Sequence, residues 1–130
     1  MKTFDDVMTR FREIEFSEEF DTIVAIANGG ILPASILNER LGIDFQLIKI
    51  NFRDEVQRPR FSHPRLLEPL SFDPAGRKIL LVDDRIKTGS TLVLAKEILS
   101  SAALIRTFAV NGTADYALYD EACFRFPWKG

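Results

Sequence analysis

Apolar and polar residues follow one another along this 130-residue chain in patterns that change from one segment to the next. Near the start, apolar residues recur every three or four positions over residues 4–14, and this spacing predicts a helix with one apolar face. Two later segments, Thr22–Ala27 and residues 79–82, are short apolar runs. Such runs are typical of strands buried inside a parallel sheet. The pattern therefore predicts both helices and buried strands.

The pattern continues as an alternation of helices and strands. Pro33 suits the first turn of a helix and Gly42 suits its end. In chain order, we expect a helix over Ile31–Leu41, a strand over Asp44–Asn51, a helix over residues 92–99, a strand over residues 104–110 and a short strand over residues 122–126. This alternation predicts a Rossmann-like α/β fold, with a mostly parallel twisted sheet and helices on both faces. The length predicts a single domain over residues 1–130.

Composition and charge narrow the classes of function. A net charge of −2 argues against broad binding of nucleic acid. No stretch is apolar over the length that a membrane span needs, and the N-terminal segment lacks the apolar core of a signal peptide. Cys123 is the single cysteine, so an internal disulfide is impossible. We therefore expect a cytoplasmic enzyme or binding domain whose partner is neither nucleic acid nor membrane.

The segment after the apolar run 79–82 combines the groups that bind a sugar phosphate. Asp83 and Asp84 come first, and Thr-Gly-Ser-Thr at residues 88–91 leads into the next helix. Backbone N–H groups at the start of a helix attract a phosphate, and the hydroxyls can donate to the same anion. The acids suit sugar hydroxyls or a magnesium shell instead. A ribose 5-phosphate offers both kinds of group; the alternative is an ordinary strand with an acidic turn and a serine N-cap.

This order of apolar strand, two acids, three residues and Thr-Gly-Ser-Thr resembles the signature loop of the type I phosphoribosyltransferases. In that family, the acids hold the ribose 2- and 3-hydroxyls of phosphoribosyl pyrophosphate, and the Thr-Gly segment holds its 5-phosphate. The resemblance implies a transferase of nucleotide metabolism, such as purine salvage, that moves the phosphoribosyl group to a nucleobase, releases pyrophosphate and uses Mg²⁺. The residues so implied are Thr88, Gly89, Ser90 and Thr91 for the phosphate, and Asp83 and Asp84 for the ribose and, indirectly, the metal.

A second loop, directly after Thr22–Ala27, resembles the pyrophosphate loop of the same family. It contains Asn28, Gly29 and Gly30, and paired glycines let a backbone approach a ligand closely. The resemblance implies that this loop binds pyrophosphate, with Asn28 in a position that is usually Arg or Lys. An asparagine can donate hydrogen bonds there but brings no charge. Glycines after a buried strand can also serve the geometry of the turn alone.

Residues 52–77 contain four prolines and several arginines, which predicts a long irregular loop. Loops of this length inside a compact domain are usually functional or mobile. In the family, this region is a flexible lid that closes over the reaction, so the resemblance implies that Arg53 contacts the substrate. The alternative is a solvated loop whose arginines pair with nearby acids.

The C-terminal segment, residues 111–130, resembles the hood that covers the base in the shorter xanthine-guanine members. It ends in Phe-Pro-Trp, and its aromatic side chains are candidates for stacking on a base: Tyr116, Tyr119, Phe124 and Trp128. Each of them could equally belong to the core or to a subunit interface. The family suggests a homodimer or a larger assembly.

Two positions depart from the members that act on 6-oxopurines. Lys87 stands where an acid serves as general base, and a lysine with its ordinary pKa of about 10.4 stays protonated at neutral pH. Asn111 stands where a lysine reads the oxo group of the purine. We expect Lys87 in the catalytic set with Asp83 and Asp84, and Asn111 in the binding set. Two hypotheses stay open: a transferase acting on a nucleobase-like acceptor, or a regulator that binds phosphoribosyl pyrophosphate or a nucleotide without turnover.

Overall fold

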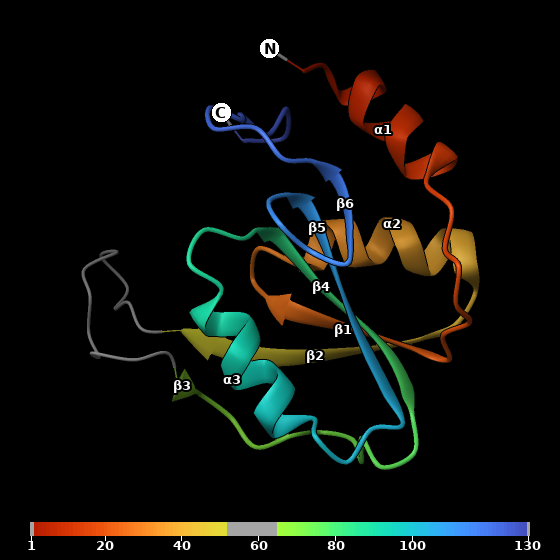
Figure 1. Ribbon diagram of the computed structural model, residues 1–130, viewed down its shortest axis with the longest axis vertical. Helices are drawn as coiled ribbons and strands as arrows, with labels where there is room; N and C mark the ends of the chain where they lie inside the picture. Colours follow the sequence, from red (N-terminus) through yellow and green to blue (C-terminus); the bar gives the residue numbers. More distant parts are fainter. Residues whose placement is uncertain (1, 52–64, 130) are drawn as a thin grey trace.

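The computed structural model describes residues 2–51 and 65–129 of the chain (Figure 1). Every predicted helix, and every predicted strand except the one over residues 122–126, is present in this described part. The elements are α1 (Phe4–Glu13), β1 (Thr22–Ala27), α2 (Ile31–Leu41), β2 (Asp44–Asn51), β3 (Arg65–Leu66), β4 (Lys78–Arg85), α3 (Ser90–Ile98), β5 (Leu104–Asn111) and β6 (Tyr116–Tyr119).

The strands form one sheet in the order β3-β2-β1-β4-β5-β6. Every neighbouring pair is parallel except β2 and β3, whose short antiparallel contact pairs Ile50 with Leu66. The predicted irregular loop over residues 52–77 is therefore wrong at Arg65–Leu66, where the backbone extends the sheet beyond β2. Residues 52–64, including Arg53, lie outside the described part.

Helices cover both faces of the sheet, which confirms the predicted layers (Figure 1). On one face, Phe11 of α1 and Leu37 of α2 share an apolar core with Phe108 of β5. On the other face, Leu92 and Leu99, in and just after α3, join a second apolar core with β1, β2 and β4. Because β1 and β4 are covered on both sides, their sequences read as unbroken apolar runs rather than alternating ones.

The helix ends follow from local chemistry. At the start of α1, the Thr3 hydroxyl accepts a hydrogen bond from the Asp6 N–H at 3.1 Å, and the Asp6 carboxylate accepts one from the Thr3 N–H at 2.8 Å. This reciprocal pair satisfies two N–H groups that the helix itself leaves without partners. At the end of α2, Gly42 adopts a left-handed conformation with φ of 65°, as its position in the sequence predicted.

The C-terminal segment differs from the prediction. Residues 122–126 form no strand, and the last strand of the described chain is β6, which pairs with β5. Phe124 and Phe126 are both buried, so their alternation matches that of a strand. However, β6 already occupies the edge of β5, and the segment packs through its side chains instead. It lies beside α1 (Figure 1). There, the rings of Phe4 and Trp128 meet edge to face.

Candidate functional site

The two adjacent acids lie at the carboxyl end of β4. This strand runs to Arg85, beyond the predicted end at residue 82, so Asp83 pairs with Ala109 of β5 and both acids belong to the sheet. Asp83 is half-buried and Asp84 is buried. The Asp83 carboxylate accepts a hydrogen bond from the Asp84 N–H at 2.8 Å, and the Asp84 carboxylate accepts one from the Arg85 N–H at 2.6 Å. The main chain therefore fixes the orientation of both carboxylates.

The neighbouring groups give the two acids different electrostatics. Burial, and then repulsion from the adjacent Asp84 carboxylate, raises the pKa of Asp83 to about 8. The Asp84 N–H and the charge of Lys129 act in the opposite direction on this pKa, and more weakly than burial does. Lys129 also forms an ion pair with Asp84, with its Nζ 3.2 Å from Oδ2. These surroundings favour the protonated form of Asp83 in the ligand-free protein.

The loop between β4 and α3 brings hydroxyls to the start of a helix. Gly89 precedes α3 in a left-handed conformation with φ of 81°, which a glycine adopts without strain. The hydroxyls of Thr88 and Ser90 lie 3.0 Å apart. Gly89 is the N-cap residue of α3 and has no side chain to accept a hydrogen bond from the first N–H groups of the helix. A helix start of this kind suits an anion, because its N–H groups and dipole are oriented toward the ligand.

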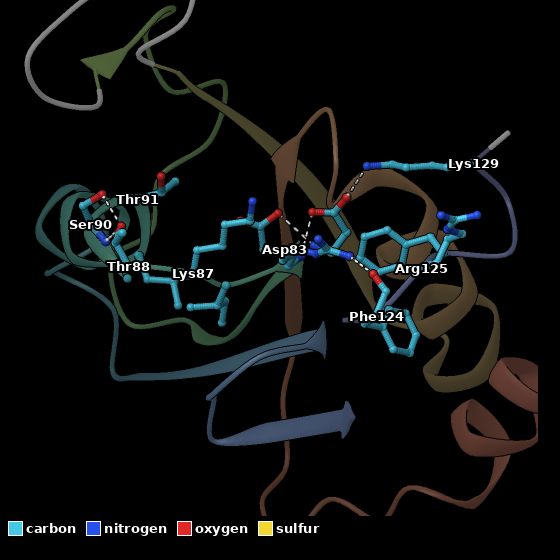
Figure 2. Close-up of a pocket in the computed structure, with 14 residues that line it drawn as sticks. Asp83, Lys87, Thr88, Ser90, Thr91, Phe124, Arg125 and Lys129 are labelled. Atoms are coloured by element: carbon cyan, nitrogen blue, oxygen red, sulfur yellow. Dashed lines mark hydrogen bonds and ion pairs between the residues drawn. The ribbon is translucent and has the colours of Figure 1, made fainter. Parts of the chain in front are cut away.

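A cleft of about 800 Å³ joins the acids to this loop (Figure 2). Its walls come from the end of β4, the β4–α3 loop, the start of α3 and the C-terminal segment. The lining residues are Asp83, Asp84, Arg85, Ile86, Lys87, Thr88, Gly89, Ser90, Thr91, Leu92, Phe124, Arg125, Phe126 and Lys129. The structure therefore brings the two predicted acids, Lys87 and the whole predicted phosphate loop into one cavity.

The turn between β1 and α2 lies against Asp84 and Val82 of β4, although it does not line the cleft. A side-chain carbon added to Gly29 would lie 2.6 Å from Oδ1 of Asp84. One added to Gly30 would overlap the main-chain oxygen of Val82 and lie 2.8 Å from that of Ile26. Both glycines are therefore required by close packing across β1 and β4. Asn28 is exposed at the same turn, and the peptide bond before it is cis.

The C-terminal segment supplies a second wall that the sequence did not predict in detail. The Arg85 guanidinium lies 5.0 Å from the centroid of the Phe126 ring and donates a hydrogen bond to the main-chain oxygen of Phe124. Arg125 is exposed and lines the cleft, as does Lys129. The aromatic residues at the end of the chain predicted that this segment belongs to the site. Nothing in the sequence pattern, however, indicated that its cations would meet the end of β4.

Two further predicted binding residues, Asn111 and Trp128, lie outside this cleft. Asn111 is buried, and its amide exchanges two hydrogen bonds with the main chain of Glu121, at 2.8 Å and 3.0 Å. Trp128 stacks on Phe126 with a centroid distance of 5.2 Å and packs against the core. In this structure both side chains hold the C-terminal segment in place. The predicted roles of these two residues in binding a base stay predictions.

The four aromatic candidates of the C-terminal segment occupy different places. Only Phe124 is among the residues that line the cleft. Tyr116 donates a hydrogen bond to Glu18 at 2.9 Å, and Tyr119 is buried in the core.

Two carboxylates at the cleft, Asp83 and Asp84, are the groups that could take part in holding a metal ion. In residues 2–51 and 65–129, no group of three or more His, Cys, Asp or Glu side chains gathers as a metal site. Two carboxylates alone suit Mg²⁺, which usually keeps several waters and completes its shell with substrate phosphates. No helix in the described chain has the length and apolar character of a membrane span.

Comparison with known proteins gives one consistent family. The family model described as the phosphoribosyl transferase domain matches residues 2–114. An orotate phosphoribosyltransferase of Sulfurisphaera tokodaii is 35% identical over 98 residues, which are 75% of this chain and 46% of that protein. The chain thus spans about half the length of this relative.

Two further proteins are similar over most of their length. A xanthine-guanine phosphoribosyltransferase of Idiomarina loihiensis is 24% identical over 119 residues, covering 86% of this chain and 73% of that protein. The crystal structure of a purine phosphoribosyltransferase from Pyrococcus horikoshii superposes with a TM-score of 0.80 at 25% identity, covering 99% of this chain and 92% of that one.

Proposed function

This chain belongs to the phosphoribosyltransferase family, as its signature loop predicted, and we propose that it transfers the phosphoribosyl group of phosphoribosyl pyrophosphate to a nucleobase-like acceptor, with release of pyrophosphate. One observation carries the proposal. The acids at the end of β4 and the hydroxyl-rich start of α3 line a single cleft of about 800 Å³, which is large enough for a nucleotide-sized ligand. Such a reaction belongs to nucleotide metabolism, and salvage of purines is one example.

The acids are suited to hold the ribose. Hydroxyls donate and carboxylates accept, so the ribose 2- and 3-hydroxyls can donate to Asp83 and Asp84. Main-chain hydrogen bonds already hold both carboxylates in place, which lowers the entropy lost when the sugar binds. Donation by the hydroxyls also favours the charged form of Asp83, so sugar binding would lower the raised pKa of that carboxyl.

The loop before α3 is suited to hold the 5-phosphate. The hydroxyls of Thr88, Ser90 and Thr91 and the backbone around Gly89 surround the start of the helix. Lys87 lies in the same wall with an exposed side chain, and its positive charge favours a phosphate nearby. This role suits a protonated lysine better than the role of general base, which needs a free amine.

The turn Asn28–Gly30 is suited to the pyrophosphate end. Gly29 lies directly against the Asp84 carboxylate, so a ribose held by Asp84 would have this turn as its neighbour. The absence of a side chain at Gly29 is what lets the turn lie this close to the Asp84 carboxylate. Asn28 is exposed there and can donate hydrogen bonds from its amide. Arg53 lies outside the described residues, and the proposal that it binds the pyrophosphate rests on the family resemblance alone.

The donor set fits Mg²⁺. Asp83 and Asp84 offer two carboxylates, and one or two carboxylates are the share of a magnesium shell that proteins usually supply beside a phosphorylated substrate. When bound, the ion would neutralise charge on the pyrophosphate leaving group. The contribution of the chain is positioning: the acids fix the ribose, the Thr-Gly-Ser-Thr loop fixes the phosphate, and the cleft walls restrict access of water to the reacting carbon.

A regulator that binds the same ligand without turnover is the second candidate. One observation favours it: a lysine, Lys87, occupies the position that the family resemblance gives to the general base. The test is release of pyrophosphate from phosphoribosyl pyrophosphate and Mg²⁺ in the presence of each of a panel of nucleobases. Release that depends on one base and is lost in Asp84→Asn supports the transferase. Binding of phosphoribosyl pyrophosphate without release by any base supports the regulator.

A further inference from the structure

A lysine of the C-terminal segment occupies one of the carboxylates that the proposed function gives to the ribose. The ammonium nitrogen Nζ of Lys129 lies 3.2 Å from Oδ2 of Asp84, and Figure 2 draws this contact as a dashed line from Lys129. Both side chains line the cleft. In the ligand-free protein, an acid that would accept a ribose hydroxyl therefore already has a partner from the chain itself.

Asp84 has little room for a second partner. Its side chain is only 12% exposed. The oxygen Oδ1 accepts the hydrogen bond from the Arg85 N–H at 2.6 Å, and a side-chain carbon added to Gly29 would lie 2.6 Å and 2.8 Å from the two oxygens. The main chain thus covers two sides of the carboxylate, and Lys129 lies at Oδ2. A ribose hydroxyl that enters from the cleft therefore competes with the ammonium for this oxygen.

Further contacts hold the ammonium of Lys129 in this position. The Lys129 N–H donates to the main-chain oxygen of Phe126 at 3.2 Å, and Nζ lies 5.0 Å from the centre of the Phe126 ring, whose face attracts a cation. The segment itself is fixed to β4, because Arg85 donates a hydrogen bond to the main-chain oxygen of Phe124. The ion pair is therefore formed from a lysine whose main chain is already in place.

The side chain of Lys129 is nevertheless able to leave Asp84. It is 60% exposed, and an ion pair with an exposed partner is weak because water solvates the released charge. Release of the ammonium leaves the main-chain hydrogen bond to Phe126 intact. Ribose binding can therefore displace the ammonium while the C-terminal segment stays folded.

We propose that Lys129 makes an autoinhibitory contact: its ammonium competes with a ribose hydroxyl for Asp84, and the sugar binds fully only when this ion pair opens. The inference rests on the proposed function, because Asp84 is a carboxylate assigned there to the ribose. The contact weakens the binding of the sugar hydroxyl specifically, since Lys129 lies on the C-terminal segment and not in the loop that is proposed to bind the phosphate.

The ratio of affinities between ribose 5-phosphate and its 2-deoxy or 3-deoxy analogue measures the contribution of one hydroxyl. All three sugars contain the same phosphate, so a change in the charge of the cleft affects them alike and cancels in the ratio. In the wild type, competition from Lys129 lowers the ratio. In Lys129→Met, calorimetric titrations should find at least one of the two ratios raised by about two- to five-fold, the range expected for an ion pair with an exposed partner.

Lys2→Met is the matched control. Lys2 also forms an ion pair at 3.2 Å, with Glu121, and its Nζ lies 4.9 Å from the centre of the Tyr119 ring. Because Lys2 does not line the cleft, both ratios should equal those of the wild type. Lys129→Arg keeps the positive charge, and its ratios should stay closer to the wild type than those of Lys129→Met.

Two results would overturn the inference while the proposed function stands. Unchanged or lower ratios in Lys129→Met would show that the ammonium does not compete with the ribose. An equal rise in Lys2→Met would assign the effect to the net charge of the protein rather than to Asp84. Failure of ribose 5-phosphate to bind the folded wild type and Lys129→Met would instead remove the proposed function, and the inference with it.

Discussion

Neighbouring side chains at the end of β4 have different surroundings, and these differences decide their chemistry. Asp84 is buried, receives the Arg85 N–H and pairs with Lys129. Asp83 is one residue away, and burial beside a second carboxylate raises its pKa to about 8. Asp83 and Asp84 have different surroundings because successive side chains of a strand point to opposite faces of the sheet.

The raised pKa predicts how stability depends on pH. In the unfolded chain, Asp83 releases its proton near its ordinary pKa of about 4, whereas the folded protein keeps that proton up to about pH 8. The native state therefore binds more protons across this window, and the contribution of Asp83 to stability falls as pH rises from about 4 to 8. In Asp83→Asn this contribution is absent. Free energies of unfolding from denaturant titrations at several pH values should show a flatter profile for the variant.

The comparison of the two proteins isolates Asp83. The two proteins differ only at this residue, so the difference between their profiles reports Asp83. Asp44 has a lowered pKa, caused by hydrogen bonds from Gln46 and Arg77, and its contribution is lost only below about pH 4. Parallel profiles for wild type and Asp83→Asn between pH 5 and 8 would show that the pKa of Asp83 is not raised in the folded protein.

We expect the Thr91 hydroxyl to donate a hydrogen bond to the phosphate of the ligand. Thr91→Val keeps the shape of the side chain and removes one donor from the start of α3. The affinity for phosphoribosyl pyrophosphate should fall by about 1.5 to 3 kcal/mol, the usual range for a hydrogen bond to a charged group. Thr113→Val is the control, since Thr113 is exposed, bonds to Asp120 and does not line the cleft. Calorimetry should find equal affinities for the control and wild type; an equal affinity for Thr91→Val would remove that hydroxyl from the phosphate site.

At the scale of elements, the two turns at the carboxyl edge of the sheet have unequal freedom. The turn after β1 is packed directly against β4, and Gly30 is buried between the two strands. The loop after β4 is open, since a side-chain carbon at Gly89 would meet nothing within 4 Å. The first turn is therefore fixed by packing, and the second has room for a ligand.

Gly30→Ala tests the tight turn. The backbone conformation of Gly30, with φ of −79°, suits an alanine, so the cost is purely steric. The added methyl group would overlap the main-chain oxygen of Val82, and we expect a loss of at least about 2 kcal/mol in the free energy of unfolding. Gly42→Ala is the matched control: it has φ of 65° and open space, so left-handed strain alone should cost about 1 kcal/mol. Equal losses in denaturant titrations would mean that the turn can move away from β4.

The elements themselves were largely predictable from the sequence. The bounds of β1, α2 and β2 follow directly from an apolar run, a proline, a terminal glycine and an alternation of apolar and polar residues, all of which act locally. Residues 122–126 have the apolar alternation of a strand, but which segment pairs with β5 depends on competition for one edge, and β6 occupies it. The apolar alternation correctly indicates that Phe124 and Phe126 are buried. It does not indicate which segment pairs with β5.

At the scale of the molecule, the site joins segments that are far apart in the chain. The acids and the phosphate loop are continuous in sequence, so a single motif could predict them. Lys129 reaches Asp84 across 45 positions, and Arg85 meets Phe126 across 41, because the C-terminal segment packs back over the end of β4. These contacts were beyond prediction, since they arise from tertiary packing of a segment without regular structure. The parallel sheet is what places all of these groups at one edge.

The central claim is that the two acids and the phosphate loop form one site for a ribose 5-phosphate. The most direct measurement is a calorimetric titration with phosphoribosyl pyrophosphate and Mg²⁺ of the wild type and of the double variant Asp83→Asn, Asp84→Asn. A second adjacent pair of acids, Asp120 and Glu121, is exposed and lies outside the cleft, so Asp120→Asn, Glu121→Gln is the matched control. The account predicts binding by the wild type and the control, and an affinity at least about ten-fold lower for the acid-pair variant. Undiminished binding by a folded acid-pair variant, or no binding by the wild type, would contradict it.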